Sequence, residues 1–248
     1  MPYVVTSEEW TKARIALLTK EKELQRLRDE LAAERRALPW ERIPPSKLET
    51  YTFTTDAANK TATLSDLFGN ASQLIIVHHM WSPTDETNCP SCSFFADQYN
   101  GVDVHLKHRD TSFVVVSRAP IEKLEAMKKR MGWTFKWVSQ NPTSTFNQDL
   151  GVSVDPGVTP TVPYNYTGPI PDGSTIKFAA EMPGVSVFSK DPVNKDSNEI
   201  YHTYSTFARG VDPLNVAYQL LDLTPIGRDE DRLPWTMEWV RRKDEYED

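Results

Sequence analysis

The spacing of apolar residues in the first 40 positions predicts one long amphipathic helix, over residues 6 to about 38. Large apolar residues recur there every seven positions: Trp10, Leu17, Leu24, Leu31 and Leu38. Thr6 and Glu9 have the spacing of a capping box at its start. A stripe of this kind packs along its own domain or pairs with a second copy, and we expect packing on the body with a homodimer contact through this helix.

A buried strand followed by a short helix organises the rest of the chain. Residues 74–77 are all apolar and mostly β-branched, which favours a central strand covered on both faces. Pro90 suits the first turn of a helix, because its missing N–H would have no partner there and its φ is already helical. The helix should therefore open at Cys89, with Cys92 one turn later, and these are the only two cysteines in 248 residues.

The same patterns predict several shorter elements. Strands are expected at 51–54 on a sheet edge, at 112–117 and 133–139, and at 184–188 and 199–207 as an antiparallel hairpin. Helices are expected at 63–69, from 90 to about 99, at 121–131 and from 212 to about 221. We interpret Pro44-Pro45 as a stiff linker, residues 141–175 as an irregular proline-rich insertion, and 234–242 as a tail strapped to the surface by its tryptophans.

Composition narrows the class of protein. The net charge of −7 and pI near 5.3 argue against a nucleic-acid surface, and 39% hydrophobic with 25% charged residues is an ordinary globular balance. No apolar run approaches the roughly 18 residues of a membrane span, and the N-terminus lacks the features of a signal peptide. A cytoplasmic location is therefore expected, where paired thiols are more often catalytic than structural.

The sequence Cys89-Pro90-Ser91-Cys92 after a strand is typical of thiol–disulfide exchange. Because the positive end of a helix stabilises a thiolate, Cys89 should be the more acidic and the more exposed thiol. Cys92, facing the core, can close a disulfide onto it. The expected redox group is this disulfide alone, without another cofactor or a metal.

Other interpretations of the two cysteines remain open. They can be inert core residues. They can also hold zinc, since His105-x-x-His108 follows after twelve residues, one short of a zinc-finger spacing. Pro83 and Thr87 before Cys89 resemble the pattern of peroxiredoxins, whose threonine orients a peroxide. Those proteins have two residues between Thr and Cys, whereas a single asparagine stands here.

The predicted order βαβα followed by ββα is that of thioredoxin, with an N-terminal helix added. The chain also resembles the DUF899 family of thioredoxin-like proteins, described as predicted dithiol–disulfide oxidoreductases. The segments that carry the resemblance are Trp10 to Trp40, His78-His79-Met80, 89–97, 132–135, 146–149, 183–188, 202–212 and 223–229. We accordingly expect an α/β thioredoxin-like domain over 46–230, an N-terminal helix and linker over 1–45, and a C-terminal tail over 231–248.

The resemblance also suggests which residues surround the dithiol. Thioredoxins carry a cis-proline before the first hairpin strand, and Pro183 stands there, so Met182 should present its backbone to a substrate. We expect Trp81 to contact substrate as well. His78 and His79 occupy the strand where thioredoxin has a buried acid, and alternation places them on opposite faces. Two further residues, Tyr204 and Arg209, are candidates for the wall of the pocket.

These observations predict a thiol–disulfide oxidoreductase, in which Cys89 attacks and Cys92 resolves the mixed disulfide. Its partner would be a disulfide or thiol, either protein or small molecule. The alternatives are a thiol peroxidase, a specialised small-molecule enzyme, or a thioredoxin-fold binding protein without redox turnover.

Overall fold

The computed structural model describes residues 3–55, 58, 60–153, 163–166, 181–194 and 197–247. The chain divides into two units, residues 1–40 and 41–248. Of the predicted insertion at 141–175, the segments 154–162 and 167–175 lie outside the described residues.

The first unit is the predicted helix, α1 (Ser7–Arg36). The capping box is present: the Glu9 N–H donates to Thr6 Oγ1 at 3.3 Å, and the Thr6 N–H donates to Glu9 Oε2 at 2.9 Å. Acidic residues occupy the first turn and basic residues the last, which suits the helix dipole. None of its residues is buried, and its large apolar residues are 45–59% exposed at Trp10, Leu17, Leu24, Leu31 and Leu38.

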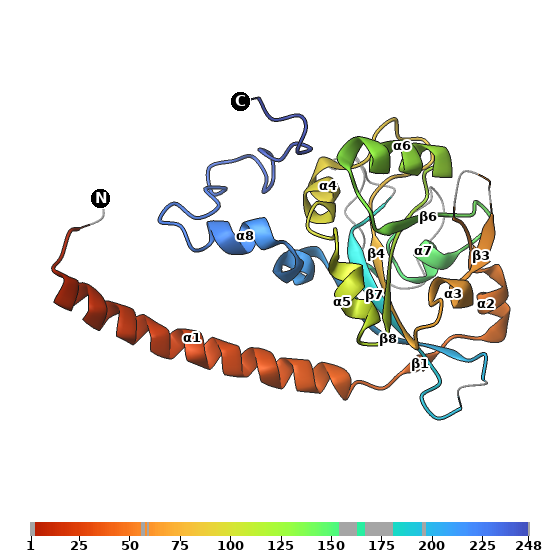
Figure 1. The fold of residues 1–248 in the computed structure, drawn as a ribbon, viewed down its shortest axis with the longest axis horizontal. Coiled ribbons are helices and arrows are strands. Elements are labelled where there is room, and N and C mark those ends of the chain that lie inside the picture. The colour runs from red at the N-terminus through yellow and green to blue at the C-terminus, as the bar shows by residue number, and fades with distance from the viewer. Residues whose placement is uncertain are drawn as a thin grey trace. The chain divides into compact units, whose positions relative to one another are not determined.

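The second unit is built on an eight-stranded sheet in the described part of the chain (Figure 1). In spatial order its strands are β1 (Glu41–Arg42), β8 (Ile200–Phe207), β7 (Gly184–Lys190), β4 (Gln73–His78), β5 (Thr111–Ser117), β6 (Lys136–Gln140), β2 (Thr52–Thr54) and β3 (Thr61–Thr63). Strand β4 pairs in parallel with β5 and antiparallel with β7, and β7 forms an antiparallel hairpin with β8. The order β8-β7-β4-β5 is the thioredoxin core, so the predicted thioredoxin-like fold is confirmed.

Helices cover both faces of this sheet. They are α2 (Pro45–Thr50), α3 (Leu64–Leu67), α4 (Pro90–Ala96), α5 (Val102–Lys107), α6 (Ile121–Met131) and α7 (Phe146–Asp149). The remaining helix, α8 (Val216–Leu221), packs on α4 through the rings of Tyr218 and Phe94, and 3-10 turns lie at Tyr164–Tyr166 and Ala208–Leu214. Aromatic residues 133, 135 and 137 pack with α4 and α6 on one face. Phenylalanines 53, 68, 146 and 188 form the core of the other face. Because β4 has a core on each side, its end is fixed firmly in position.

Several predicted elements differ from the structure. Pro45 opens α2 instead of continuing a linker, because the N1 position of a helix needs no N–H donor. Strand β2 is not at the edge, since it pairs with β6 on one side and β3 on the other. The predicted strand 133–139 begins only at Lys136, and the helix predicted from 212 to 221 is a 3-10 turn followed by α8, which Asn215 caps.

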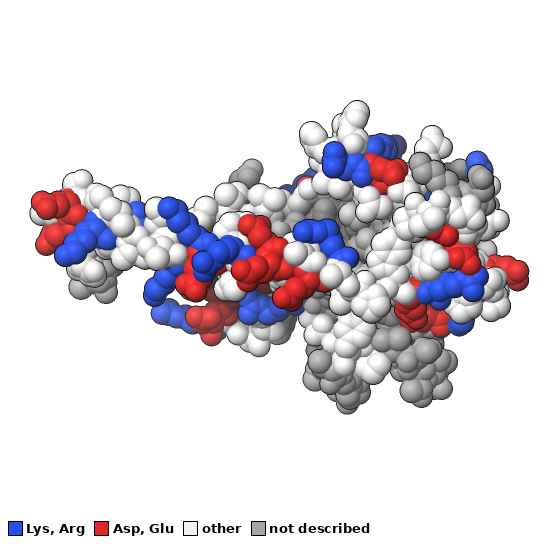
Figure 2. Space-filling view, turned by 90° about the horizontal axis from the view of Figure 1, so that it is seen from below, with Lys and Arg blue, Asp and Glu red and all other residues white. Residues whose placement is uncertain are grey.

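Charges of both signs are interspersed on the face shown in Figure 2, without an extended patch of one sign there. Within the described ranges, no helix combines the length and apolar character needed to cross a bilayer.

Candidate functional site

The two cysteines lie where β4 leads into α4. Cys89 is the N-cap of α4, with extended backbone angles, and Pro90 occupies the first turn as predicted. The Cys89 N–H donates to the Met80 carbonyl at 3.3 Å, which ties the loop back to the end of β4. The Cys89 carbonyl accepts from the Ser93 N–H at 3.1 Å and from the Ser93 hydroxyl at 3.0 Å. The backbone at Cys89 is therefore held from both directions.

The two thiols are free, and they differ in acidity. A hydrogen bond from the Cys92 thiol lowers the pKa of Cys89, and N–H groups of Cys92 and Ser91 add to this effect against the cost of burial. The same hydrogen bond, together with burial, raises the pKa of Cys92 well above its usual value. Cys89 is thus the more acidic thiol, in the order that the helix N-terminus predicts.

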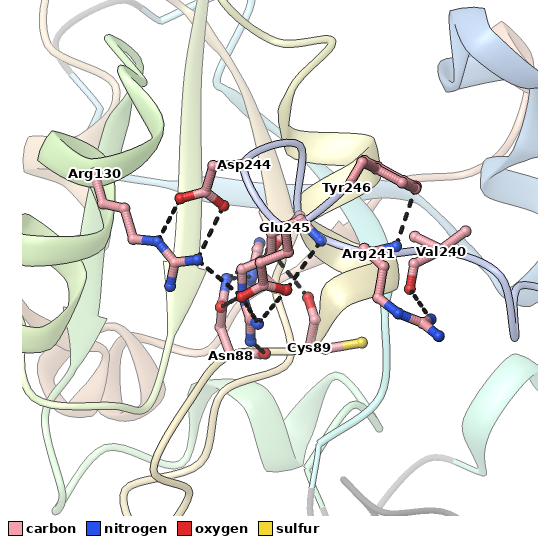
Figure 3. A network of polar contacts seen from close by, with 11 residues as sticks. Asn88, Cys89, Arg130, Val240, Arg241, Asp244, Glu245 and Tyr246 are labelled. Carbon is pink, nitrogen blue, oxygen red and sulfur yellow. Dashed lines mark hydrogen bonds and ion pairs between the residues drawn. The ribbon is translucent and has the colours of Figure 1, made fainter. Parts of the chain in front are cut away.

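The predicted exposure of Cys89 is wrong. Cys89 is 4% exposed and Cys92 is 8% exposed, so both are buried. The residue before Cys89 is covered by a contact from a distant part of the chain. Arg242, itself 6% exposed, donates from Nε to the Asn88 side-chain oxygen at 2.9 Å and from Nη2 to the Asn88 carbonyl. Figure 3 shows Asn88 and Cys89 beneath this part of the chain.

Asn88 connects this contact to the interior of the site. It is fully buried, and its amide nitrogen donates to Ser93 Oγ at 2.8 Å and to His79 Nε2 at 3.0 Å. Its four polar contacts therefore join the helix, the end of β4 and Arg242 immediately before Cys89. The sequence does not predict that Asn88 connects these parts, since an asparagine before a helix is typical of a loop.

Residues 236–246, which we call the C-terminal segment, are held at further points. Arg130 on α6 donates to Asp244 at 2.6 and 2.9 Å and to Glu245 at 2.8 Å (Figure 3). Glu245 also accepts from Arg242 at 2.8 Å. Trp239 packs edge-to-face on Phe94 of α4, with ring centres 5.6 Å apart. The predicted attachment of the tail through tryptophan is confirmed at Trp239, although Trp235 is 63% exposed.

A cavity of about 290 Å³ opens beside the dithiol. Its walls come from the end of β4, the first turns of α4, the start of β7, residues 208–212 and the C-terminal segment. Of the residues predicted at the site, the cavity brings together His78, His79, Cys92, Pro183 and Arg209.

Cys89 and the remaining predicted residues do not line this cavity. Trp81 is 3% exposed and donates its indole N–H to the Asp85 carbonyl at 3.2 Å. Met182 is buried, and its N–H donates to the Val152 carbonyl at 2.7 Å. Tyr204 lies opposite Val187 in the hairpin.

The predicted cis geometry at Pro183 is not found. Throughout the described part of the chain all peptide bonds are trans, the Met182–Pro183 bond included. The Pro183 carbonyl accepts a hydrogen bond from the Tyr164 hydroxyl at 2.9 Å.

His78 and His79 are both buried at the end of β4, and they have different neighbours. The ring of His79 lies against Trp137, with centres 4.7 Å apart, and burial lowers its pKa to about 3 with a contribution from Arg242. Burial lowers the pKa of His78 to about 4. Both imidazoles are therefore neutral at physiological pH.

His78 belongs to a buried polar chain that sequence reasoning missed. Its Nδ1 lies 3.2 Å from Asn147 Oδ1, and its Nε2 lies 2.9 Å from the Ser186 hydroxyl. Asn147 in turn donates to Glu181, which pairs with Arg118 at 3.0 Å. Burial raises the pKa of Glu181 to about 7. With both ring nitrogens engaged, His78 is fixed in one orientation.

Two alternative readings of the cysteines can be compared with the structure. His105 lies in α5 and His108 caps its end, and the described residues hold no group of three or more His, Cys, Asp or Glu side chains suited to a metal ion. Pro83 and Thr87, which suggested a peroxidase, are exposed and do not line the cavity.

The fold and the paired cysteines define a thioredoxin-like protein with a Cys-x-x-Cys motif at the start of the helix that follows the central strand. The model of the DUF899 family, described as bacterial protein of unknown function, matches residues 1–246. The chain belongs to this family, as its motifs indicated.

Among solved structures, the chain is similar to a cysteine-to-serine mutant of PrxQ from Xylella fastidiosa, with 14% identity, a TM-score of 0.43, and coverage of 73% of this chain and 95% of that one. It is also similar to the peroxidoxin BcpB from Mycobacterium tuberculosis, with 14% identity, a TM-score of 0.42, and coverage of 69% and 97%. Among curated proteins, none matches the chain.

Proposed function

We propose that this protein is a dithiol–disulfide oxidoreductase in which Cys89 is the nucleophile and Cys92 resolves the intermediate. The observation that carries the proposal is the position of the two thiols, since Cys89 is the N-cap of α4 and Cys92 lies in its first turn, where the pKa of Cys89 is lowered, mainly by the Cys92 thiol, and that of Cys92 is raised. This arrangement stabilises a thiolate at Cys89 and a thiol at Cys92, the two forms that exchange requires.

The reaction proceeds in two displacements. The Cys89 thiolate attacks one sulfur of a substrate disulfide, so that a mixed disulfide forms and the other substrate sulfur leaves as a thiolate. That thiolate takes the Cys92 proton, because the charge and the hydrogen bond of Cys89 that raised the pKa of Cys92 are lost once Cys89 is in the mixed disulfide. The Cys92 thiolate then attacks the Cys89 sulfur, closes the Cys89–Cys92 disulfide and releases the second substrate thiol, which takes a proton from water. The substrate is thus reduced by two electrons and the dithiol is oxidised.

The neighbouring imidazoles orient this centre rather than transfer protons. The Nε2 of His79 accepts from Asn88, and both nitrogens of His78 have partners. Neutral rings beside the thiols keep positive charge away from Cys92, and His79 holds Asn88 in place. In this mechanism His78 and His79 are positioning residues.

The test combines an acidity measurement with a redox titration. The pKa of Cys89 is measured from thiolate absorbance in Cys92→Ser, with Cys89→Ser as the control. The proposal expects a value below the ~8.5 of free cysteine and, in the wild type, a Cys89–Cys92 disulfide that forms and breaks reversibly in a dithiothreitol or glutathione buffer.

Three results would contradict the proposal. An ordinary pKa without a reversible disulfide would indicate a binding protein. Rapid oxidation of Cys89 by peroxide, with turnover, would indicate a peroxidase. Activity that survives in Cys89→Ser would place the chemistry elsewhere.

A further inference from the structure

We infer that the dithiol acts on small, apolar disulfides and that the C-terminal segment keeps protein disulfides away from it, an inference that rests on the proposed function.

The first argument is access. A thiolate attacks a disulfide sulfur along the S–S axis, so the substrate sulfur must approach Cys89 or its neighbour closely. Cys89 is 4% exposed and Cys92 8% exposed, whereas a protein disulfide brings two bulky backbones with it. The cavity reaches the dithiol at Ser91 and Cys92, and Cys89, which is not among its lining residues, is bonded to the Cys92 thiol. While the C-terminal segment stays in place, a small molecule in this cavity is therefore the substrate that comes nearest to Cys89.

The second argument is the chemistry of the cavity. Its wall is mainly apolar, with Val77, Met80, Phe95, Val185, Val211 and Met237, and the two charged residues that also line it, Arg209 and Asp212, pair with each other at 3.4 Å. A volume of about 290 Å³ accommodates roughly ten water-sized groups. Such a space favours a compact apolar molecule, because burial of its surface stabilises the complex and no buried charge awaits a counterion.

The third argument is that one segment both shapes the cavity and covers Asn88, the residue next to Cys89. Thr236 and Met237 contribute to the cavity wall. Arg242, which follows them in the same segment, bonds to Asn88, the residue before Cys89. The Met237 N–H donates to Glu230 at 3.0 Å, so this end of the segment is held independently of Arg242.

Arg241 provides a matched control for the contact between Arg242 and Asn88. Arg242 is 6% exposed and bonds to buried Asn88, whereas Arg241 is exposed and donates only to carbonyls of its own segment, Glu238 at 2.8 Å and Val240 at 3.0 Å. Replacing Arg242 by Ala should release the cover over Asn88. Replacing Arg241 by Ala removes the same charge without that effect.

The test uses one leaving group on two carriers. Pre-reduced protein is mixed with 4,4′-dithiodipyridine, which is small and neutral, or with the same pyridyl disulfide formed on a surface cysteine of a carrier protein. Release of thiopyridone gives the rate constant, which is divided by that of free glutathione with the same probe. Closure of the Cys89–Cys92 disulfide is followed by mass spectrometry, with Cys89→Ser as the blank.

In the wild type the normalised rate constant should be at least about tenfold higher for the small probe than for the protein probe. In Arg242→Ala this ratio should fall by a similar factor, because the loss of buried hydrogen bonds from a charged group favours detachment of the C-terminal segment by this order. Arg241→Ala should keep the wild-type preference. Arg130→Ala loosens the segment from α6 and provides a second variant if Arg242→Ala fails to fold.

Equal normalised rates for both probes in the wild type would overturn the inference while leaving the proposed function intact. Absence of reaction at Cys89 with either probe would overturn both.

Discussion

Arg242 and Asn88 are 154 positions apart, yet the guanidinium of Arg242 donates to both the side-chain oxygen, at 2.9 Å, and the carbonyl of Asn88, the residue that precedes the acidic cysteine. Asn88 uses its amide group for His79 and Ser93 at the same time. The end of the chain is therefore bonded directly to the structure that positions the dithiol.

Loss of this contact should destabilise the protein measurably. Arg242→Ala leaves both oxygens of buried Asn88 without their charged donor, and hydrogen bonds to charged groups contribute about 1.5–3 kcal/mol. We expect the free energy of unfolding, measured by urea titration, to fall by about that amount. In Arg241→Ala the change should stay within about 0.5 kcal/mol, as at other surface sites. Equal effects of the two substitutions would show that the contact with Asn88 contributes no stability.

The side chain at position 92 should control the acidity of Cys89. The Cys92 thiol is the main donor that lowers the pKa of Cys89. In Cys92→Ser a hydroxyl can still donate, whereas in Cys92→Ala the donor is lost. The pKa of Cys89, measured by the rate of alkylation against pH, should therefore be higher in Cys92→Ala than in Cys92→Ser. The same value in both variants would mean that the N–H groups of α4 alone set the acidity.

Much of the fold could be predicted because its signals are local. The bounds of α6 match the prediction at both ends, since its apolar residues repeat with helical spacing and Gly132 ends it with a positive φ of 66°. The hairpin β7–β8 was evident from its two strand patterns around a polar turn. Strand β2 was misjudged as an edge because a three-residue strand carries no sign of how many partners it has.

The position of the two cysteines could be predicted from the sequence, whereas the residues that surround them could not. The Cys-Pro-Ser-Cys sequence and Pro90 determine the position of the thiols, because a helix start is a local feature. The buried contact of Arg242 with Asn88, the residue before Cys89, could not be predicted, because no periodicity links two residues so far apart in sequence. Asn147, in the short helix α7, and Glu181, which it joins to His78, were missed for the same reason, since all three residues are far apart in sequence.

The apolar stripe of α1 should mediate dimer formation. Leu17, Leu24 and Leu31 are 49–53% exposed and repeat every seven residues, which fills one of the two apolar heptad positions of a two-stranded coiled coil, while the other holds Lys20, Leu27 and Glu34. We propose that the protein is a homodimer through this helix. Light scattering after size-exclusion chromatography should give twice the mass of the chain, and Leu17→Glu with Leu24→Glu should give a monomer. Lys22→Glu, which leaves the stripe intact, should remain dimeric. A monomeric wild type at micromolar concentration would contradict the proposal.

Burial of His79 should make stability depend on pH in a defined range. Its pKa in the folded protein is about 3, because burial disfavours the charged ring, whereas in the unfolded chain it is about 6.5. Between these values the unfolded state binds a proton that the folded state does not. The free energy of unfolding should therefore fall as pH drops below about 6.5, by up to about 1.4 kcal/mol per pH unit for one such group, and this group has no effect above that pH.

Replacing His79 by Gln removes this titration while leaving an acceptor for Asn88. Urea unfolding between pH 5 and pH 8 should show a shallower loss of stability on acidification in His79→Gln than in the wild type. Part of the slope should remain, because the pKa of His78 is also lowered by burial, to about 4. His105→Gln changes an exposed residue and should leave the slope unchanged. A slope that is the same in His79→Gln as in the wild type would show that the His79 ring takes up its proton equally well in the folded protein.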